Sequence, residues 1–321
     1  MTNPSTTGTP ALCIGECMVE LSRGNDGRYD MAFGGDTFNT AVYLARCGTP
    51  VRYATALGDD AYSASICDLA RSEGILTDCI DIRANRMPGL YLIETSPAGE
   101  RSFNYWRDTA PAREVFDHDR GLNDRLGRAI RSAPLAYFSG ITLSLYSPAG
   151  LERFAELLAE ARVAGATIAM DGNYRPRGWK GDADRARAVM ERFWRLADVA
   201  LPTFDDEAAL WDDTSTDQTL QRLSAFGVTE VAVKLGAEGA LCGEPGVGLY
   251  HVRPPVVIAP VDTTAAGDSF NAAYLATRLS GGPPALAGDA GNRLAGIVIQ
   301  HRGAIVPRSA TDGIVGAPPC A

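Results

Sequence analysis

The sequence is poor in the residues that most often serve as metal ligands or catalytic bases. Only three of the 321 residues are histidines, His118, His251 and His301, and none has the surroundings of a zinc site. The seven cysteines lack paired CxxC spacing, and Cys13 and Cys17 fall in an apolar stretch typical of a buried strand. We therefore expect reduced thiols in a cytoplasmic protein, and neither a histidine-bound metal nor a Ser-His pair.

Long apolar runs and positive charge are also scarce. No run of about 18 apolar residues occurs, so no membrane span is predicted. The start, MTNPSTTGTP, lacks the basic end and apolar core of a signal peptide. The net charge of −9, without a basic run, argues against nucleic acid as a partner. A Walker A motif is absent, and no GxGxxG follows the first strand, so a nucleotide would have to be bound in another way.

Strand-like and helix-like segments alternate along most of the chain. Strands are expected at 51–58, 135–140, 166–171, 199–202 and 231–236, and helices at 36–47, 60–73, 148–164, 182–197, 216–226, 268–279 and 284–300. This alternation predicts an α/β fold, a mostly parallel sheet with helices on both faces, which binds ligands beyond the carboxyl ends of its strands. Residues 17–33 and 87–109 instead alternate in polarity like hairpins, so we expect one domain over 11–318 that contains them as a small β lid.

The stretch DTTAAGDSF combines small residues with an acid at the start of a predicted helix. Ala265, Ala266 and Gly267 would present backbone amides at the helix N-terminus, where an anion is favoured and a phosphoryl group could approach closely. Asp268 would stay ionised and could accept a proton from an attacking hydroxyl. Because alanine avoids positive φ, ordinary backbone is expected at Ala265. A capped helix with an acidic first turn would explain the same pattern.

A second glycine-led helix start, FGGDTFNTAVYLARCG, lies near the N-terminus. Gly34 and Gly35 free the backbone to approach a ligand, and Asp36 or Thr37 could cap the helix. Asn39 could bond a substrate hydroxyl. Glycines needed only for a tight turn are the alternative.

Together these stretches resemble the signatures of the ribokinase-like (PfkB) family of carbohydrate kinases. The resemblance runs from about residue 11 to 308 and includes VKLGAEGA at 233–240. It implies a sandwich-like α/β fold with a β lid, and transfer of phosphate from ATP to a sugar hydroxyl with Mg²⁺. It also implies that Asp268 is the base and that the amides of residues 265–268 form an anion hole.

Further motifs, including PGLYLIET, YWR and DGNYRPRGW, resemble the 2-keto-3-deoxygluconate kinases of that family. The resemblance implies that the substrate is an acid sugar phosphorylated at O6, bound by Tyr91, Tyr105, Arg107, Arg175 and the backbone of Gly34 and Gly35. Guanidinium groups suit such a substrate because they bind carboxylates in a two-pronged pair. A solvated loop charge is the alternative for Arg175. A fructokinase-like enzyme and a catalytically silent sugar or nucleotide sensor remain the rival functions.

The resemblance also implies a nucleotide side and ion sites. The positions implied for ATP are Lys234, Gly236, Gly239, Gly267 and Asn292. Glu207 matches a family glutamate that holds Mg²⁺ through water, although Phe204 replaces the asparagine of that motif. Asp262 and Thr264 resemble a site for a monovalent cation such as K⁺. Apolar lid faces predict a homodimer or higher homo-oligomer formed through the lid.

Overall fold

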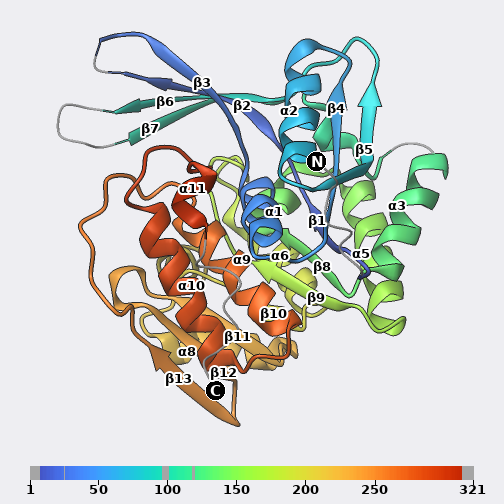
Figure 1. Ribbon diagram of the computed structural model, residues 1–321. Helices are drawn as coiled ribbons and strands as arrows, with labels where there is room; N and C mark the ends of the chain where they lie inside the picture. The colour runs from blue at the N-terminus through green and yellow to red at the C-terminus, as the bar shows by residue number, and fades with distance from the viewer. Residues whose placement is uncertain (1–7, 25, 96–100, 118–119, 313–321) are drawn as a thin grey trace.

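The structure is a computed structural model that describes residues 8–24, 26–95, 101–117 and 120–312 (Figure 1). The expected end of the domain at residue 318 and residues 96–100 of the expected lid segment 87–109 lie outside these residues. None of the helices within the described ranges is both long and apolar enough to cross a lipid bilayer.

A nine-stranded sheet forms the centre of the molecule, in the order β13-β12-β11-β10-β9-β8-β1-β4-β5. Its strands are β1 (Ala11–Ile14), β4 (Val51–Gly58), β5 (Leu76–Arg83), β8 (Leu135–Ser139), β9 (Thr167–Asp171), β10 (Val199–Ala200), β11 (Glu230–Lys234), β12 (Ala240–Glu244) and β13 (Gly248–Val252). Neighbouring strands are parallel from β11 to β5, and β12 and β13 add an antiparallel edge. The predicted mostly parallel α/β fold is confirmed.

Helices cover both faces of this sheet (Figure 1). The α-helices are α1 (Asp36–Arg46), α2 (Ala61–Ser72), α3 (Arg120–Ser132), α4 (Gly140–Leu145), α5 (Pro148–Val163), α6 (Ala183–Trp194), α7 (Phe204–Trp211), α8 (Thr216–Phe226), α9 (Ala266–Leu279), α10 (Pro284–Val298) and α11 (Arg308–Thr311), with 3-10 turns η1 (Pro111–Glu114) and η2 (Gly236–Glu238). One apolar core joins α1, α2, α9 and α10 to the sheet, and another joins α3, α5, α6 and α8. Burial of these two cores is the main term that stabilises the fold.

The predicted hairpins form a second, four-stranded sheet at the upper left of Figure 1. Its strands are β2 (Met18–Arg23), β3 (Tyr29–Gly34), β6 (Leu90–Thr95) and β7 (Arg101–Trp106), in the order β3-β2-β6-β7. Each hairpin is antiparallel, whereas β2 and β6 pair in parallel. Because paired residues share a face, Glu20, Tyr91 and Tyr105 lie on one side of this lid, and Met31 and Trp106 lie on the other.

One sequence expectation is wrong in this region. The stretch ALCIGECMVEL was predicted to be one buried strand, but β1 ends at Ile14 and β2 begins at Met18 in the other sheet. The chain leaves the large sheet at Gly15, where a Cβ atom would lie 2.2 Å from the Thr37 hydroxyl oxygen. Glycine at this crowded position lets the backbone pass from the sheet into the lid.

Candidate active site

The small residues before Asp268 do form the entrance to a helix, as predicted. Helix α9 begins at Ala266, and Asp268 lies in its first turn, where it is 9% exposed. The expectation of ordinary backbone at Ala265 is wrong, because this N-cap residue has φ 59° and ψ 15°. Its carbonyl accepts bonds from the Ser269 amide at 2.9 Å and hydroxyl at 2.8 Å, which hold the left-handed turn. That conformation costs a non-glycine residue roughly 1–2 kcal/mol.

The second glycine-led helix begins differently from the expectation. Gly35, in extended backbone, is the N-cap of α1, so neither Asp36 nor Thr37 caps the helix. A Cβ on Gly35 would lie 2.1 Å from the Glu16 carbonyl oxygen, so glycine is required for close packing of two backbone segments. The N-cap was predicted wrongly because the contact that requires glycine at position 35 comes from Glu16, which lies outside the stretch FGGDTFNTAVYLARCG.

The two helix starts meet directly in space. The Asn39 side-chain amide donates a 2.8 Å hydrogen bond to Oδ2 of Asp268. The Thr40 hydroxyl donates to the Asp268 carbonyl at 3.3 Å, and the Gly35 amide donates to Oδ1 of Asn39 at 3.4 Å. The first glycine-rich stretch therefore orients the acid of the second.

A buried polar network lies beside Asp268 at the carboxyl ends of β9 and β11. Lys234, the last residue of β11, pairs with the Asp171 carboxylate at 3.0 Å and donates to Oδ1 of Asn271 at 3.1 Å. Asn271 in turn donates to Asp171 at 2.7 Å, and Asn173 donates to Asp36 at 2.8 Å. Sequence reasoning did not assign functional roles to these acids and amides, although Asp171 directly ends a predicted strand, which is a usable signal.

The acids of this network change the protonation of Asp268. Burial, then the nearby Asp36 and Asp171 charges, raise the pKa of Asp268 from 3.8 to about 8, against the Asn39 hydrogen bond and the Lys234 charge. This rise of the pKa works against the expectation that Asp268 stays ionised at neutral pH in the protein without ligands. Burial also raises the pKa of Asp36. A base that titrates close to the working pH is well placed for general-base catalysis.

A cavity of about 430 Å³ brings these groups together. It is lined by Ala265, Ala266 and Gly267, by Asp268, and by Asp36, Asp171, Lys234 and Arg175. A Cβ on Gly267 would lie 3.5 Å from the Lys234 ammonium nitrogen. The amides at the start of α9 thus lie beside a cation, an arrangement suited to a negatively charged ligand.

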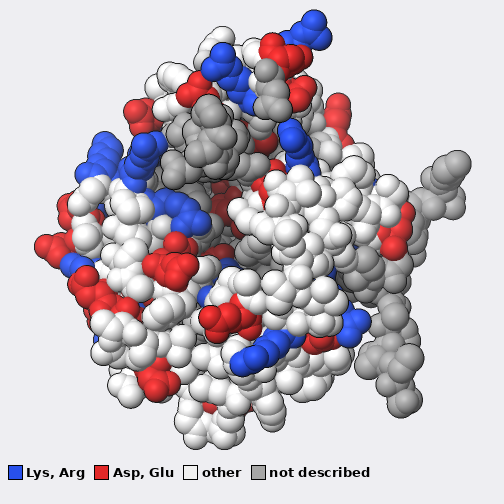
Figure 2. Space-filling view, turned by 90° about the vertical axis from the view of Figure 1, so that its left-hand side faces the viewer, with Lys and Arg blue, Asp and Glu red and all other residues white. Residues whose placement is uncertain are grey.

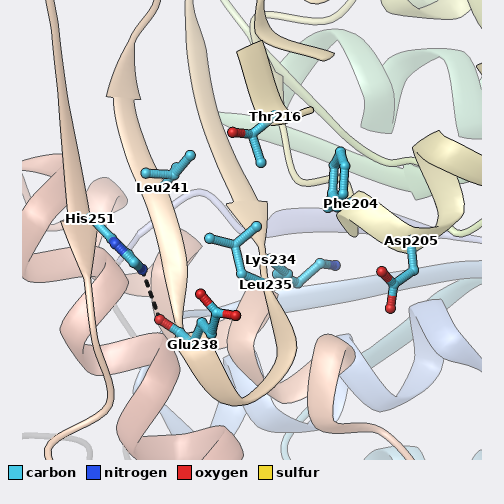
Figure 3. Close-up of a pocket in the computed structure, with 8 residues that line it drawn as sticks. All are labelled: Phe204, Asp205, Thr216, Lys234, Leu235, Glu238, Leu241 and His251. Carbon is cyan, nitrogen blue, oxygen red and sulfur yellow. Dashed lines mark hydrogen bonds between the residues drawn. The ribbon is translucent and has the colours of Figure 1, made fainter. Parts of the chain in front are cut away.

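A neighbouring cavity of about 480 Å³ shares Lys234 with the first (Figure 3). Phe204 and Asp205 from α7 line one side of it, and Leu235 and Glu238 of the β11–β12 connection line the other. An elongated anion could therefore extend from this cavity past Lys234 to the start of α9.

Two glycines and one asparagine shape this side of the molecule. Gly236 and Gly239 lie at either end of η2, and both have positive φ. A Cβ on Gly239 would lie 2.1 Å from the Val252 carbonyl oxygen, so glycine is required there. Asn292 donates to that same carbonyl at 2.9 Å and is 8% exposed, so its side chain supports the end of β13.

A third cavity, of about 340 Å³, contains the predicted carboxylate-binding residues. Tyr105, Arg107 and Arg175 all line it. Figure 2 shows a face of the molecule that is hollowed near its centre, with Lys and Arg side chains beside the hollow. The structure thus brings together three of the predicted sugar-binding side chains.

The predicted sugar-binding residues already have protein partners. Arg107 forms a buried ion pair with Glu16, and Arg175 binds both carboxylate oxygens of Asp206 at 2.8 and 3.0 Å. The Tyr91 hydroxyl donates to the buried Glu20. A Cβ on Gly34 would lie 2.9 Å from the Tyr91 hydroxyl and 3.5 Å from Oδ1 of Asn39, so Gly34, Tyr91 and Asn39 lie close together.

The implied ion-binding residues have structural partners as well. Glu207 is fully buried and pairs with Arg222 at 3.1 Å, and burial raises its pKa to about 7. The Asp262 carboxylate accepts bonds from the Thr264 and Gly303 amides, each at 2.8 Å. In the part of the chain that the structure describes, no group of three or more His, Cys, Asp or Glu residues is arranged to hold a metal ion.

Comparison with known proteins gives consistent matches over most of the chain. Residues 9–311 match the model of the pfkB family of carbohydrate kinases. The chain is 42% identical to 2-dehydro-3-deoxygluconokinase from Escherichia coli (strain K12) over 306 residues, covering 92% of this chain and 97% of that protein. It is 25% identical to a fructokinase from Vibrio alginolyticus, covering 82% of this chain and 81% of that protein.

A solved structure has the same fold at low sequence identity. A putative ribokinase II from E. coli, in complex with ATP and Mg²⁺, superposes with a TM-score of 0.81 at 20% identity, covering 95% of this chain and 96% of that one. The arrangement of a large sheet, flanking helices and a small second sheet is therefore shared well beyond sequence similarity.

Proposed function

This chain belongs to the pfkB family of carbohydrate kinases, and from that premise we propose that it phosphorylates 2-keto-3-deoxygluconate (2-dehydro-3-deoxygluconate) at O6 with ATP. The products are 2-keto-3-deoxy-6-phosphogluconate and ADP. The strong similarity to 2-dehydro-3-deoxygluconokinase along nearly the whole chain supports this substrate, and the weaker similarity to fructokinase makes a neutral sugar the second candidate.

The observation that carries the kinase assignment is Asp268, buried beside the amides of α9 and held by Asn39. Asp268 accepts the proton of the O6 hydroxyl, O6 forms a bond to the γ-phosphorus, and the bond from that phosphorus to the bridging oxygen of ADP breaks. The amides at the start of α9 and the Lys234 ammonium stabilise the negative charge on the transferring group.

The acid end of the sugar is bound in the cavity of about 340 Å³ that Tyr105, Arg107 and Arg175 line, which we call the basic cavity. Arg107 and Arg175 supply guanidinium groups for its carboxylate, and Tyr105 supplies a hydroxyl and an apolar wall. Both guanidiniums are held by carboxylates, Glu16 and Asp206, so their positions are set before the substrate arrives. A neutral sugar would gain little from two such groups.

The metal ion is Mg²⁺, and the residues present fit it. Kinases bind this ion mainly through nucleotide phosphates and water with one or two carboxylates, so a ready-made cluster is not required. Asp171 and Asp36 line the cavity beside the α9 amides and would hold the ion's water shell. When bound, Mg²⁺ neutralises charge on the phosphates. We place a K⁺ ion, as the resemblance implies, at the loop of Asp262 and Thr264.

Two further features complete the proposal. The lid face with Tyr91 and Tyr105 covers the sugar and excludes water, which limits hydrolysis of ATP. The opposite face pairs with the lid of a second copy, since Met31 and Trp106 are 52% and 61% exposed there.

A substrate panel with one variant tests this function. ADP release is measured with ATP and Mg²⁺ on 2-keto-3-deoxygluconate, its galactose-derived epimer, gluconate, fructose and ribose. We expect a strong preference for 2-keto-3-deoxygluconate and a loss of about 10²–10⁴-fold in kcat in Asp268→Asn. A preference for fructose would support the assignment as a sugar kinase but contradict the proposed substrate. If Asp268→Asn turns over near the wild-type rate, the assignment of Asp268 as the base is contradicted. If the wild type releases no ADP with any sugar of the panel, a sugar or nucleotide sensor is favoured.

A further inference from the structure

The basic cavity holds more positive charge than the substrate's single carboxylate requires. Beside Arg107 and Arg175, its lining carries four cationic side chains and one acidic side chain, Asp108. The four additional cations are Arg113, Arg177, Lys180 and Arg185. A concentration of cations in a protein of net charge −9 is unexpected from composition alone.

Three of these cations, Arg113, Lys180 and Arg185, form no ion pair with an acidic side chain among the residues that the structure describes, and Arg185 lies instead over the ring of Trp179. Arg113 and Lys180 therefore remain as the cations of this cavity with neither contact. Arg113 lies on η1 and is only half-exposed, although its neighbour Glu114 pairs with Arg86. Lys180 is exposed in the loop that leads into α6. Half-burial of an unpaired guanidinium is costly, so a ligand with negative charge would be stabilised beside it.

Three other cations of this cavity have contacts with acidic or aromatic side chains. Glu16 and Asp206 neutralise Arg107 and Arg175, and Arg185 lies over the Trp179 ring at 5.8 Å. Asp108 is exposed at the cavity wall. Burial raises the pKa of Glu16, and the charges of Arg107 and, more weakly, Arg113 oppose this rise, so Arg113 also acts on the inner end of the cavity without forming an ion pair there.

The remainder of the molecule opposes an anionic substrate. A protein of net charge −9 repels a sugar acid at long range, whereas a cleft lined with one sign of charge concentrates the field and the ligand within it. Cations that line the same cavity as Arg107 and Arg175 would reverse this repulsion within the cavity.

We infer that Arg113 and Lys180 form an outer capture site for the carboxylate of the acid sugar, from which the substrate passes to Arg107 and Arg175. The inference rests on the proposed function, since it needs a carboxylated substrate. Arg113 and Lys180 do not touch the reacting atoms. They raise the rate at which the acid sugar binds productively, and they thereby favour charged sugars over neutral ones.

The test compares charge removal inside and outside the cavity. Arg113→Gln, Lys180→Gln and the double variant are compared with Arg128→Gln, which removes the same charge from an exposed position on α3 that has no ion-pair partner among the described residues. Initial rates give kcat and kcat/KM for 2-keto-3-deoxygluconate at about 0.01 M and about 0.15 M salt, where the Debye length is about 30 Å and about 8 Å. The KM for ATP is measured alongside.

At the lower salt concentration we expect kcat/KM for the sugar to fall about threefold in each single variant and about tenfold in the double variant. The kcat and the KM for ATP should change less than about twofold, and most of the loss should vanish at the higher salt concentration. Arg128→Gln should match the wild type.

Two results would overturn the inference in different ways. Wild-type turnover of the acid sugar with an unchanged salt dependence in the double variant would contradict the capture site and leave the kinase function intact. An equal effect in Arg128→Gln would do the same, because net charge rather than position would then matter. Absence of wild-type turnover would contradict the proposed function and the capture site with it.

Discussion

Asn39 donates a 2.8 Å hydrogen bond to Asp268, a residue 229 positions away in the chain. The bond joins the start of α1 to the start of α9, so neither signature positions the base alone. The sequence predicted Asn39 as a partner of a substrate hydroxyl, whereas in the structure its amide stabilises the ionised form of the acid. That contact opposes burial and the negative charges that raise the Asp268 pKa.

The balance of these effects predicts the pH dependence of the enzyme. Asp268 must lose its proton to act as a base, and its pKa is about 8, so kcat/KM should fall as the pH drops through about 8. Asp36→Asn removes a negative charge and should move this acidic limb to lower pH. Asn39→Ala removes a hydrogen bond to the carboxylate and should move the limb to higher pH.

The measurement is kcat/KM against pH with both substrates below saturation, which reports on the free enzyme. Asp206→Asn is a matched control for the loss of a nearby carboxylate, because Asp206 is bound to Arg175 rather than placed against the base. Shifts of Asp36→Asn and Asn39→Ala in the same direction would contradict the electrostatic account of the base.

Arg107 and Arg175 should differ when each is removed. The Arg107 and Glu16 side chains are 15% and 2% exposed, so Arg107→Ala leaves a buried carboxylate unpaired and should cost about 3–5 kcal/mol of stability. Arg175 is 53% exposed beside Asp206, and Arg175→Ala should cost less than about 1 kcal/mol. Urea unfolding measures both changes.

A rescue separates folding from substrate binding at this pair. Adding Glu16→Gln to Arg107→Ala removes the stranded charge and should restore at least half of the lost stability, while the KM for the acid sugar stays raised. If the double variant is no more stable than Arg107→Ala, the loss of stability in Arg107→Ala does not come from breaking the ion pair with Glu16.

The outer face of the lid predicts self-association. Trp106, Met31 and Tyr29 share that face through the strand register and are all exposed. Trp106→Asp places a charge at its centre and should weaken a lid-mediated dimer by about 2 kcal/mol or more. Sedimentation velocity over a range of concentrations measures the change.

Tyr62→Asp serves as the control for this experiment, because Tyr62 is an exposed aromatic residue on α2, outside the lid. It should leave the oligomeric state as in the wild type. A wild type that is monomeric at all concentrations, or a Trp106→Asp variant that remains dimeric, would contradict association through the lid.

Most of the fold could be predicted because its signals are local. Polarity alternation gave the two hairpins, and apolar runs broken by helical periodicity gave most of the parallel strands. Helix 216–226 was predicted with its observed bounds, since Gly227 ends it with positive φ. Helices α3, α4 and α7 were missed. Both α4 and α7 have fewer than nine residues and little room for periodicity.

The site was less accessible to sequence reasoning because its contacts are long-range. Asp268 and Lys234 could be proposed from their motifs, but the ion pair of Lys234 with Asp171 joins two strands that are far apart in sequence. Nothing near Arg107 in the sequence indicates that Glu16 is its partner. The raised Asp268 pKa follows from burial and from charges on other elements, which a local motif does not contain.

The left-handed Ala265 allows a last test, of strain at the anion-binding turn. With φ 59°, Ala265→Gly should relieve the clash of Cβ with the backbone and stabilise the protein by up to about 1 kcal/mol, after the added freedom of glycine in the unfolded chain is included. Ala266, one residue later, is the first residue of α9, so Ala266→Gly should destabilise by up to about 1 kcal/mol. Both values come from urea unfolding at one pH. If the two glycine substitutions destabilise equally, the left-handed turn at Ala265 is not strained, and the amides at the start of α9 are held without a cost in backbone energy.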